Sequence, residues 1–348
     1  KETLYNEEIK FRETLSKGLE ILGQEIPNIK NNKLDGKIAF KLYDTFGFPL
    51  DLTQDYLKSK KIDVDVESFD ASMKLQKEEA RSSWKGSGDG NTEKLWFDIA
   101  RKTKPTVFKG YDETTLKANV TALVLDSEVV DELSDQIKKS AIITDESCFY
   151  AESGGQVGDK GIISTENAEF KVTDTRKTPQ GIFIHFGNVI SGNFKIGNEV
   201  KLKIDSSLRE LIKKNHSATH LLHAALRNNL GLHVAQRGSL VNENKLRFDF
   251  SHNKQISSKQ IDTIQKEVTN IISNTCETQI DIKSQEEAIK QGAMALFGEK
   301  YGEEVRVVTL GENNNQPYSI ELCGGTHVTN VKDIEKFHII SEESVSSG

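Results

Sequence analysis

Apolar residues recur at helical spacing through the first 24 residues of the chain, where Ile9, Leu15 and Leu22 fall on one side. This period predicts an amphipathic helix, which the segment around Pro27 ends. Similar patterns predict further helices at residues 37–43, 50–60 and 70–84. The last of these is rich in charged residues, and we expect it to be a solvated surface helix.

The pattern changes after residues 86–91, whose sequence Gly-Ser-Gly-Asp-Gly-Asn holds three glycines and no apolar residue. Such a composition predicts a linker. Short segments rich in β-branched and aromatic residues follow, separated by Gly, Asp and Asn. Strands are expected at residues 120–125, 141–144, 148–150, 161–164, 170–175, 183–186 and 200–204. Strands of this length and spacing predict a small barrel or sandwich.

A third pattern begins at Asp205, which can cap a helix with apolar residues on one side and Gly231 at its end. A strand is expected at 246–250 and a helix at 256–274. Further strands are expected at 278–282, 305–310, 319–322 and 337–340. The fold class is therefore α+β. We expect three parts: a helical segment at 1–90, a β-barrel-like subdomain at 91–204 and an α+β subdomain at 205–348.

Composition limits the classes of protein that fit. The 348 residues include 46 Lys and Arg against 53 Asp and Glu, a net charge of −7, which argues against a general nucleic-acid coat. Between residues 201 and 230, however, there are six basic and two acidic residues. Such a group is by default a solvated surface, and the alternative is a face that contacts an RNA phosphate backbone. No apolar run reaches the roughly 18 residues of a membrane span, so no membrane association is expected.

The chain ends and cysteines add two further expectations. The start of the chain has neither an initiator Met nor a signal-peptide pattern, so we expect a part of a longer protein. Three cysteines cannot form a disulfide framework, which predicts a reducing, cytoplasmic location.

Two short motifs carry metal-binding side chains. His216 and His220 are four residues apart, which on a helix places both imidazoles on one face, about 5–6 Å apart. Cys323 and His327 flank a flexible Gly-Gly turn, and thiolate and imidazole are good zinc donors. Each pair has an ordinary alternative, a polar helix surface or a small buried thiol. Together the two pairs predict one zinc ion per chain. His223 is a spare candidate ligand, but a role in supporting the ligands or on the surface is favoured for it.

The residue after the first histidine argues against one class of enzyme. A zinc metallopeptidase of the HExxH type needs a glutamate there as general base, and this chain has Ser217.

Two polar segments are candidate pocket walls. Gly154 and Gly155 follow an apolar run, and paired glycines let the backbone approach a ligand and bind developing negative charge through N–H groups. Gln156 adds a donor and an acceptor. The alternative is a simple hairpin turn. Gln236 lies in a polar cluster before the 246–250 strand, which is either a pocket wall or an ordinary loop.

Seven segments of the chain together resemble bacterial alanyl-tRNA synthetases, over essentially the whole length. They are HSATHLLHAALR from His216, AQRGSLV around Gln236, LRFDFSH at 246–252, AMALFGEKY at 293–301, CGGTH at 323–327, FYAESGGQVGDKG at 149–161 and KLYDTFGFPLDLT at 41–53. The two metal motifs alone would also fit threonyl-tRNA synthetases and free-standing editing proteins. The 41–53 segment favours the alanyl family.

The resemblance implies the end of the helical tRNA-recognition region, followed by the editing domain. The class II aminoacylation core, which uses ATP and Mg²⁺, and the C-terminal oligomerisation domain are expected to be absent from this chain. The parent would ligate alanine to tRNA(Ala). This part would bind the acceptor end of that tRNA and hydrolyse its mischarged seryl or glycyl ester, because an apolar methyl-sized pocket rejects an added hydroxyl only about 10²-fold.

The resemblance also implies roles for individual residues. His216, His220, Cys323 and His327 would bind Zn²⁺, although Cys323 could instead act near the ester. Gln236 would help to discriminate the seryl hydroxyl. Gly154, Gly155 and Gln156 would form the loop beside the scissile ester. The alternative function is a non-catalytic, zinc-stabilised module that only positions the acceptor stem.

Overall fold

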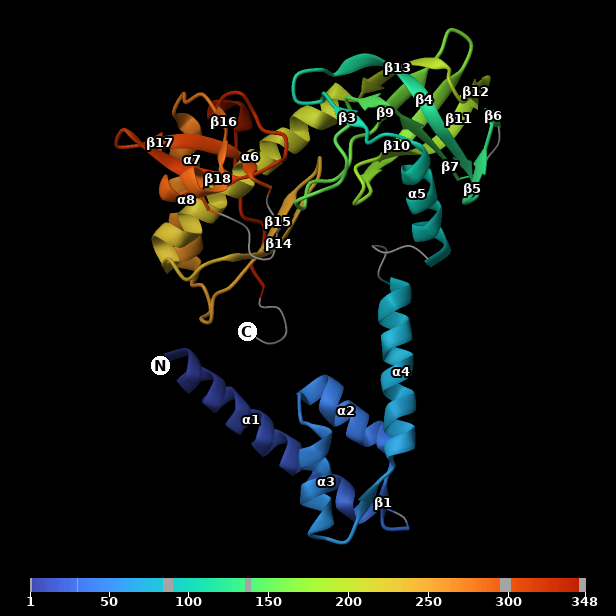
Figure 1. The fold of residues 1–348 in the computed structure, drawn as a ribbon. Coiled ribbons are helices and arrows are strands. Elements are labelled where there is room, and N and C mark those ends of the chain that lie inside the picture. Colours follow the sequence, from blue (N-terminus) through green and yellow to red (C-terminus); the bar gives the residue numbers. More distant parts are fainter. Residues whose placement is uncertain (1, 30, 84–89, 135–138, 295–301, 344–348) are drawn as a thin grey trace. The chain divides into compact units, whose positions relative to one another are not determined.

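The computed structural model describes residues 2–29, 31–83, 90–134, 139–294 and 302–343. The chain divides into two compact units, Lys1–Asp89 and Gly90–Gly348, each of which is described by itself (Figure 1). Within the described residues, none of the helices combines the length and the apolar character that crossing a membrane requires.

The first unit is helical. Its elements are α1 (Glu2–Glu25), a short 3-10 helix η1 (Ile26–Asn28), β1 (Lys33–Leu34), α2 (Gly36–Phe46), α3 (Leu50–Lys58), β2 (Asp63–Val64) and α4 (Val66–Ser83). The Asp35 side chain caps α2 by accepting from the backbone N–H of Lys37, and Gly47 ends the helix with a left-handed φ of 68°. The core gathers around fully buried Leu22, Leu42 and Leu57. The helices predicted within this unit are present.

The predicted linker at 86–91 falls mostly on residues 84–89, which lie outside the described part of the chain. Its last two residues were predicted wrongly, because α5 (Gly90–Lys102) begins at Gly90. The sequence pattern does not predict this helix. Its apolar side packs on the outside of the strands that follow: Ile99 is buried among Ala122 and Ile143, and Trp96 meets Phe186 edge-to-face at 5.7 Å. Packing against a sheet therefore stabilises a helix that starts in a glycine-rich segment.

A closed barrel follows α5. Its strands are β4 (Thr115–Leu125), β7 (Ser140–Thr144), β9 (Gly161–Ser164), β10 (Glu169–Lys177), β11 (Phe183–Ser191) and β13 (Glu199–Ile204). They are ordered β13-β9-β10-β11-β7-β4, and β4 pairs again with β13, which closes the ring. Alternating side chains fill the interior, as in β13 with Val200, Leu202 and Ile204 buried. Of the two predicted alternatives, barrel or sandwich, the barrel is the one that forms.

Shorter strands lie around the barrel. They are β3 (Val107–Phe108), β5 (Glu128–Val130), β6 (Glu132–Ser134), β8 (Glu146–Ser147) and β12 (Asn193–Lys195). The strand predicted at 148–150 is wrong, and these residues form an irregular segment after β8. Two of their backbone N–H groups bond to side chains: the N–H of Phe149 donates to Ser147 Oγ, and that of Tyr150 donates to Asp159 Oδ2.

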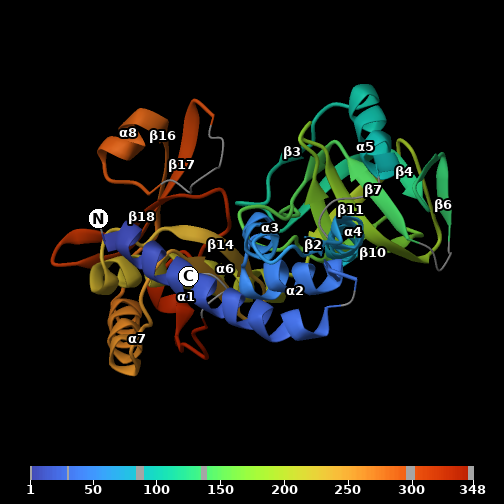
Figure 2. The ribbon, with the colours of Figure 1, turned by 90° about the horizontal axis from the view of Figure 1, so that it is seen from below.

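The remainder of the second unit is α+β. It contains α6 (Ser206–Leu230), β14 (Gln236–Val241), β15 (Leu246–Phe250), α7 (Ser258–Ser273), β16 (Gln279–Ser284), α8 (Gln285–Lys290), β17 (Glu304–Asn313), β18 (Gln316–Leu322) and the 3-10 helix η2 (Val331–Ile334). Strands β16, β17 and β18 form an antiparallel sheet against α6 and α7, and β14 and β15 form a hairpin beside α6 (Figure 2).

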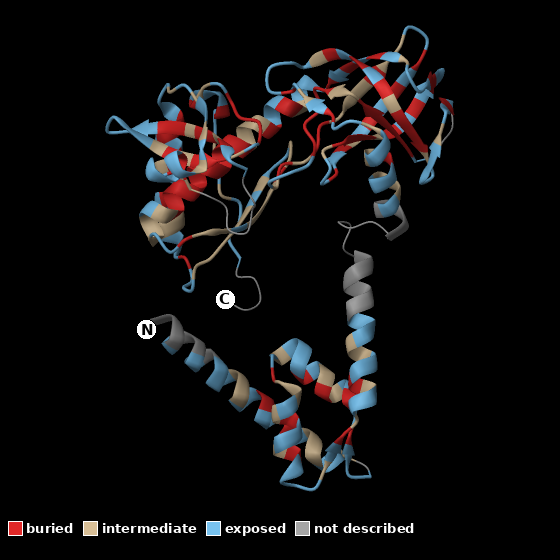
Figure 3. Ribbon diagram, in the orientation of Figure 1, coloured by how far each residue is buried: buried red, intermediate tan, exposed pale blue. Residues whose placement is uncertain are grey.

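Several features of this part differ from the sequence-based expectation, among them helix α8 and the 3-10 helix η2, which were not predicted. Strand β14 was not predicted, because its polar residues line a pocket and it lacks an apolar alternation. The strand predicted at 337–340 is wrong. There the apolar residues Phe337 and Ile339 pack against the core, and the N–H of Ile339 donates to the Gln265 side chain, without strand pairing. Burial is concentrated along α6, where His216, His220 and Leu221 all lie inside (Figure 3).

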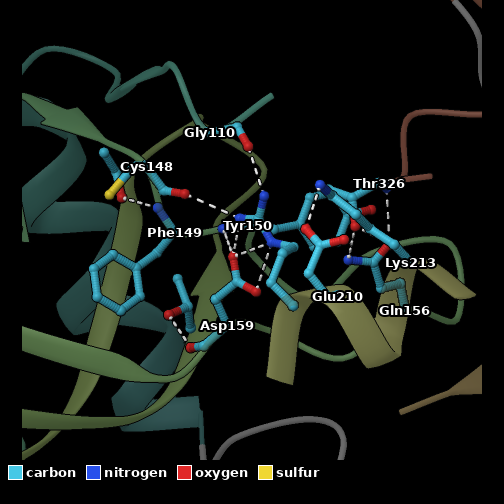
Figure 4. Close-up of polar contacts among 12 residues, drawn as sticks. Gly110, Cys148, Phe149, Tyr150, Gln156, Asp159, Glu210, Lys213 and Thr326 are labelled. Carbon is cyan, nitrogen blue, oxygen red and sulfur yellow. Dashed lines mark hydrogen bonds and ion pairs between the residues drawn. The ribbon is translucent and has the colours of Figure 1, made fainter. Parts of the chain in front are cut away.

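A buried ion pair joins the start of α6 to the barrel (Figure 4). The Arg209 side chain donates to both Asp159 carboxylate oxygens, and its Nη1 and Nη2 donate to the backbone carbonyls of Gly110 and Cys148. Asp159 also accepts from the N–H of Tyr150. Both charged residues are only 2% exposed. Because every buried charge is matched, removing one partner would leave the other uncompensated.

We predict that Arg209→Met lowers the free energy of unfolding of the second unit by about 3–5 kcal/mol, since Asp159 would then be a buried, unpaired carboxylate. Urea denaturation followed by circular dichroism measures this. The matched control is Arg176→Met, which breaks the exposed pair with Asp174 and should cost less than about 1 kcal/mol. Equal, small losses in both variants would contradict the assignment of a joining role to Arg209.

Candidate metal centre and its pocket

Helix α6 carries the first two candidate ligands. Asp205 caps it, because its Oδ1 accepts from the N–H groups of Ser207 and Leu208 at 3.0 and 3.1 Å. His216 and His220 lie one turn apart on the buried side, with ring centroids 5.1 Å apart. The helix therefore presents both imidazoles to the same point, as the spacing predicts.

The turn after β18 carries the other two candidates. Arg306 holds this turn by donating from Nη1 to the carbonyls of Cys323 and Gly325, both at 2.9 Å. The Tyr111 hydroxyl donates to the Gly324 carbonyl at 2.6 Å, and the Arg306 guanidinium lies 4.4 Å above the Tyr111 ring. The turn is thus fixed by three side-chain hydrogen bonds to its backbone.

These two elements bring four donors together. Cys323 Sγ lies 3.5 Å from His216 Nε2 and 3.4 Å from His327 Nε2. The donor atoms of His216, His220, Cys323 and His327 all lie within 4.8 Å of one another. The cluster could therefore hold a metal ion.

Burial keeps the three imidazoles in the form that binds metals. Burial lowers the pKa of His216 and of His220 to about 3, and it also lowers the pKa of His327 well below its ordinary value. The nearby Arg306 guanidinium lowers all three pKa values further. Neutral imidazole offers a lone pair, which a metal ion requires.

The donor set fits Zn²⁺ in two respects. Zinc–ligand distances of about 2.0–2.3 Å in a tetrahedron place a sulfur and a nitrogen about 3.6 Å apart, close to both observed sulfur–nitrogen distances. His220 Nε2 is buried and makes no hydrogen bond among the described residues. Such a lone nitrogen is costly unless something binds it, and a cation at the cluster would do so.

A pocket of about 260 Å³ opens over the cluster. Its walls come from the glycine loop (Ser153, Gly154), from β14 (Gln236, Ser239) and from the 323–325 turn. Gln236 Nε2 donates to Ser239 Oγ at 3.1 Å, so the two polar side chains form one wall. Of the two alternatives for the Gln236 segment, a pocket wall or an ordinary loop, the structure has the first: the segment is a strand that lines a pocket.

The glycine loop is a tight turn that also reaches the pocket. Ser153 and Gln156 exchange backbone hydrogen bonds across Gly154 and Gly155, whose φ values of 58° and 83° match a type I′ turn. A Cβ on Gly155 would lie 2.1 Å from Ser239 Oγ, so only glycine fits there. The segment is therefore the hairpin turn that the sequence allowed, and Gly154 lines the pocket, while a close approach of this loop to a ligand stays a prediction.

The remaining sequence candidates lie as follows. The Gln156 side chain does not line the pocket, since it is fully buried behind His216. His223 is not one of the four clustered donors; its Nδ1 contacts Glu321 Oε1 at 2.9 Å, and the same oxygen lies 3.8 Å from His220 Nδ1. The AMALFGEKY segment at 293–301 lies outside the described residues from position 295 onward.

The basic residues around α6 form less of a surface than their number suggests. Arg209 is buried in its ion pair, and Lys213 and Lys214 pair with Glu210 and Glu335. Counting charges between residues 201 and 230 therefore overestimates how much unpaired positive charge lies on the surface near the cluster.

The residues that hold the ligands in place were not predicted from the sequence. Ser217 was noted only as a missing glutamate, but its Oγ lies 3.3 Å from His327 Nδ1 and accepts from the N–H of Val328 at 3.1 Å. No motif in the sequence points to Arg306 or Tyr111, which fix the turn, because each contacts it from a distant strand or loop.

A metal-type cluster of three histidines and one cysteine, at the base of a pocket between a barrel and an α+β layer, defines the class of site. Comparison with known proteins then gives the family. Residues 1–208 match the family described as tRNA synthetases class II (A), and residues 305–348 match the "Threonyl and Alanyl tRNA synthetase second additional domain". The chain belongs to the class II (A) tRNA synthetases.

Individual relatives are more specific. The chain is 49% identical to the alanine–tRNA ligase of Parvibaculum lavamentivorans, with all of the chain and 39% of that protein covered. It is 46% identical to the alanine–tRNA ligases of a Chelativorans species and of Mesorhizobium japonicum, again over the whole chain and 40% of each. The chain thus spans about two fifths of the length of the curated relatives it matches.

Proposed function

We propose that the second unit is an editing hydrolase that cleaves serine or glycine from tRNA(Ala) charged with the wrong amino acid. The observation that carries the proposal is the His216, His220, Cys323 and His327 cluster at the base of a small polar pocket. In this proposal 91–204 and 205–348 supply opposite walls of the pocket. The first unit would be the end of the tRNA-recognition helices of a longer protein that joins alanine to tRNA(Ala) with ATP and Mg²⁺.

The size of the pocket supports a small aminoacyl group. About 260 Å³ is below the roughly 300–1,000 Å³ of pockets that enclose drug-sized ligands. An amino acid with a short side chain, joined to the last ribose of the tRNA, would fit with the nucleic acid remaining outside.

The polar wall supports selection against alanine. Gln236 and Ser239 offer amide and hydroxyl groups that can bond to a seryl hydroxyl. An alanyl methyl group placed there would leave these polar groups unpaired, whereas the space that a glycyl group leaves can hold a water that bonds to them. Sites built around such a hydrogen bond reject the analogue that lacks it by large factors, about 10⁴–10⁵.

The chain's own groups would bind and orient the ester. The Ser153–Gly154 backbone closes one side of the pocket, and the fixed turn at 323–325 closes the other. Arg306, which lines the pocket, adds a positive charge that would stabilise negative charge developing on the ester oxygen. A Zn²⁺ ion held by the four donors would supply Lewis acidity and a fixed point of attachment for the substrate.

The direct test is a deacylation assay with purified, zinc-loaded protein and tRNA(Ala) charged with serine, glycine or alanine. We expect the seryl and glycyl esters to disappear far faster than without protein, and the alanyl ester to persist. Intact seryl-tRNA in the presence of zinc-loaded protein would contradict the proposal.

The second candidate is a zinc-stabilised module that positions the acceptor stem without hydrolysis. The number of donors favours this candidate. Structural zinc sites are closed by four protein ligands, and this cluster offers four donors, three of them on buried residues. In that case a chelator would unfold the second unit, and seryl-tRNA would bind without losing its amino acid.

A further inference from the structure

Gln156 occupies a position between three segments that are far apart in the sequence. It follows the glycine turn of the barrel part, yet its side chain bonds to His216 on α6, 60 residues later, and to Thr326 in the metal turn, 170 residues later. The residue is 0% exposed and contributes nothing to the pocket lining. Its contacts therefore point to the metal ligands, and not to a substrate.

The hydrogen bonds around Gln156 fix the orientation of its amide. The backbone N–H of Thr326 lies 2.9 Å from Gln156 Oε1, and a backbone N–H can only donate. The atom facing it must therefore be the carbonyl oxygen. The opposite end agrees, because Gln156 Nε2 donates to Thr326 Oγ1 at 2.9 Å.

The orientation of the amide fixes the tautomer of His216. The same Gln156 Oε1 lies 2.7 Å from His216 Nδ1, and an oxygen without a proton can only accept. His216 must therefore carry its proton on Nδ1. The lone pair is then on Nε2, the atom that lies 3.5 Å from Cys323 Sγ within the cluster.

The other ring with a defined partner lacks this constraint. His327 Nδ1 lies near Ser217 Oγ at 3.3 Å, and a hydroxyl can donate as well as accept. Among these two ligands, Gln156 is thus the only partner that enforces a tautomer.

We infer that Gln156 is a positioning residue for the metal site, which acts by holding His216 in the Nδ1-protonated form with Nε2 directed at the metal. Metal-binding histidines are generally held in this way by an acceptor on the second nitrogen, and loss of that acceptor weakens metal binding about 10–100-fold. This inference rests on the proposed use of the cluster as a metal site, but not on hydrolysis.

The test compares two variants whose new side chains are about as long as that of glutamine. Gln156→Met removes the acceptor, and Gln156→Glu keeps an oxygen facing both His216 Nδ1 and the Thr326 N–H. Competition with a chromophoric chelator measures the Kd for Zn²⁺, and the visible absorption of the Co²⁺-loaded protein reports ligand geometry. We expect Gln156→Met to weaken Zn²⁺ binding about 10–100-fold and to alter the Co²⁺ spectrum. Gln156→Glu should remain within a few-fold of the unmodified protein.

The control for a merely structural effect is Thr175→Val. It removes another fully buried hydrogen bond of the barrel part, from Thr175 Oγ1 to the Asp159 carbonyl, without touching the cluster. We expect a lower Tm with an unchanged Kd for Zn²⁺. Unchanged Zn²⁺ binding in Gln156→Met, or equal weakening in Gln156→Met and Gln156→Glu, would overturn the inference.

A readout on the unmodified protein keeps the inference testable if Gln156→Met does not fold. Nitrogen-15 NMR of the histidine rings in the metal-free protein should show His216 protonated on Nδ1, and an Nε2-protonated ring would overturn the inference. Failure of the unmodified chain to bind Zn²⁺ at all would instead reject the metal site, and with it the proposed function. Normal Zn²⁺ binding with no deacylation would reject only the hydrolysis.

Discussion

Gly325→Ala is expected to abolish or strongly weaken metal binding while the protein stays folded. A Cβ at this position would lie 2.0 Å from His216 Cε1 and 2.4 Å from its Nδ1, so the imidazole must leave its place. Overpacking of this kind costs about 1–3 kcal/mol of stability, which a domain can tolerate. The effect should therefore appear in the zinc content, measured by atomic emission on purified protein, and in the deacylation rate.

The neighbouring glycine supplies the control. The nearest atom to a Cβ on Gly324 is the Tyr111 hydroxyl at 3.9 Å, an ordinary contact distance, so Gly324→Ala should keep its zinc. Similar zinc contents in the two variants would show that the tight contact with His216 does not matter for the metal site.

His220→Ala and Cys323→Ala are expected to lose both the metal and the hydrolytic activity. Each removes one of four donors, and the loss of affinity should exceed the roughly 10–100-fold that follows from losing a hydrogen bond to a ligand. The measurement is zinc stoichiometry together with seryl-tRNA deacylation. The control is His223→Gln, because His223 is also buried on α6 but is not one of the four clustered donors.

The two variants also separate the two roles considered for Cys323. If Cys323→Ala keeps its zinc but loses deacylation, while His220→Ala loses both, the thiol acts on the ester and is not required as a ligand. Full zinc content in both variants would reject the ligand set.

Local spacing was enough to predict the parts of the site that one element or one turn supplies. The four-residue spacing of His216 and His220 needs only a helix to bring the rings together, and α6 provides it. Cys323 and His327 likewise need only a turn. The barrel was foreseeable as one of two alternatives, because strands such as β13 alternate buried and exposed residues.

Other features depend on contacts between distant segments, which a single sequence does not reveal. The family resemblance implied that Gln156 lies beside the ester, yet its side chain turns inward to a histidine 60 residues away. Helix α5 depends on packing against barrel strands. Strand β14 carries polar residues because it lines a pocket, and this removes the alternation that would have revealed it. Pattern-based prediction thus fails where contacts between distant segments decide the structure.

The central claim is that metal held by the cluster is needed for hydrolysis of the mischarged ester. The most direct test withdraws zinc with a chelator and follows, on the same samples, bound zinc, folding by circular dichroism and the rate of seryl-tRNA deacylation. We predict that the rate falls in proportion to bound zinc and returns when zinc is restored. Undiminished hydrolysis by folded, metal-free protein, or no hydrolysis by fully loaded protein, would contradict the claim.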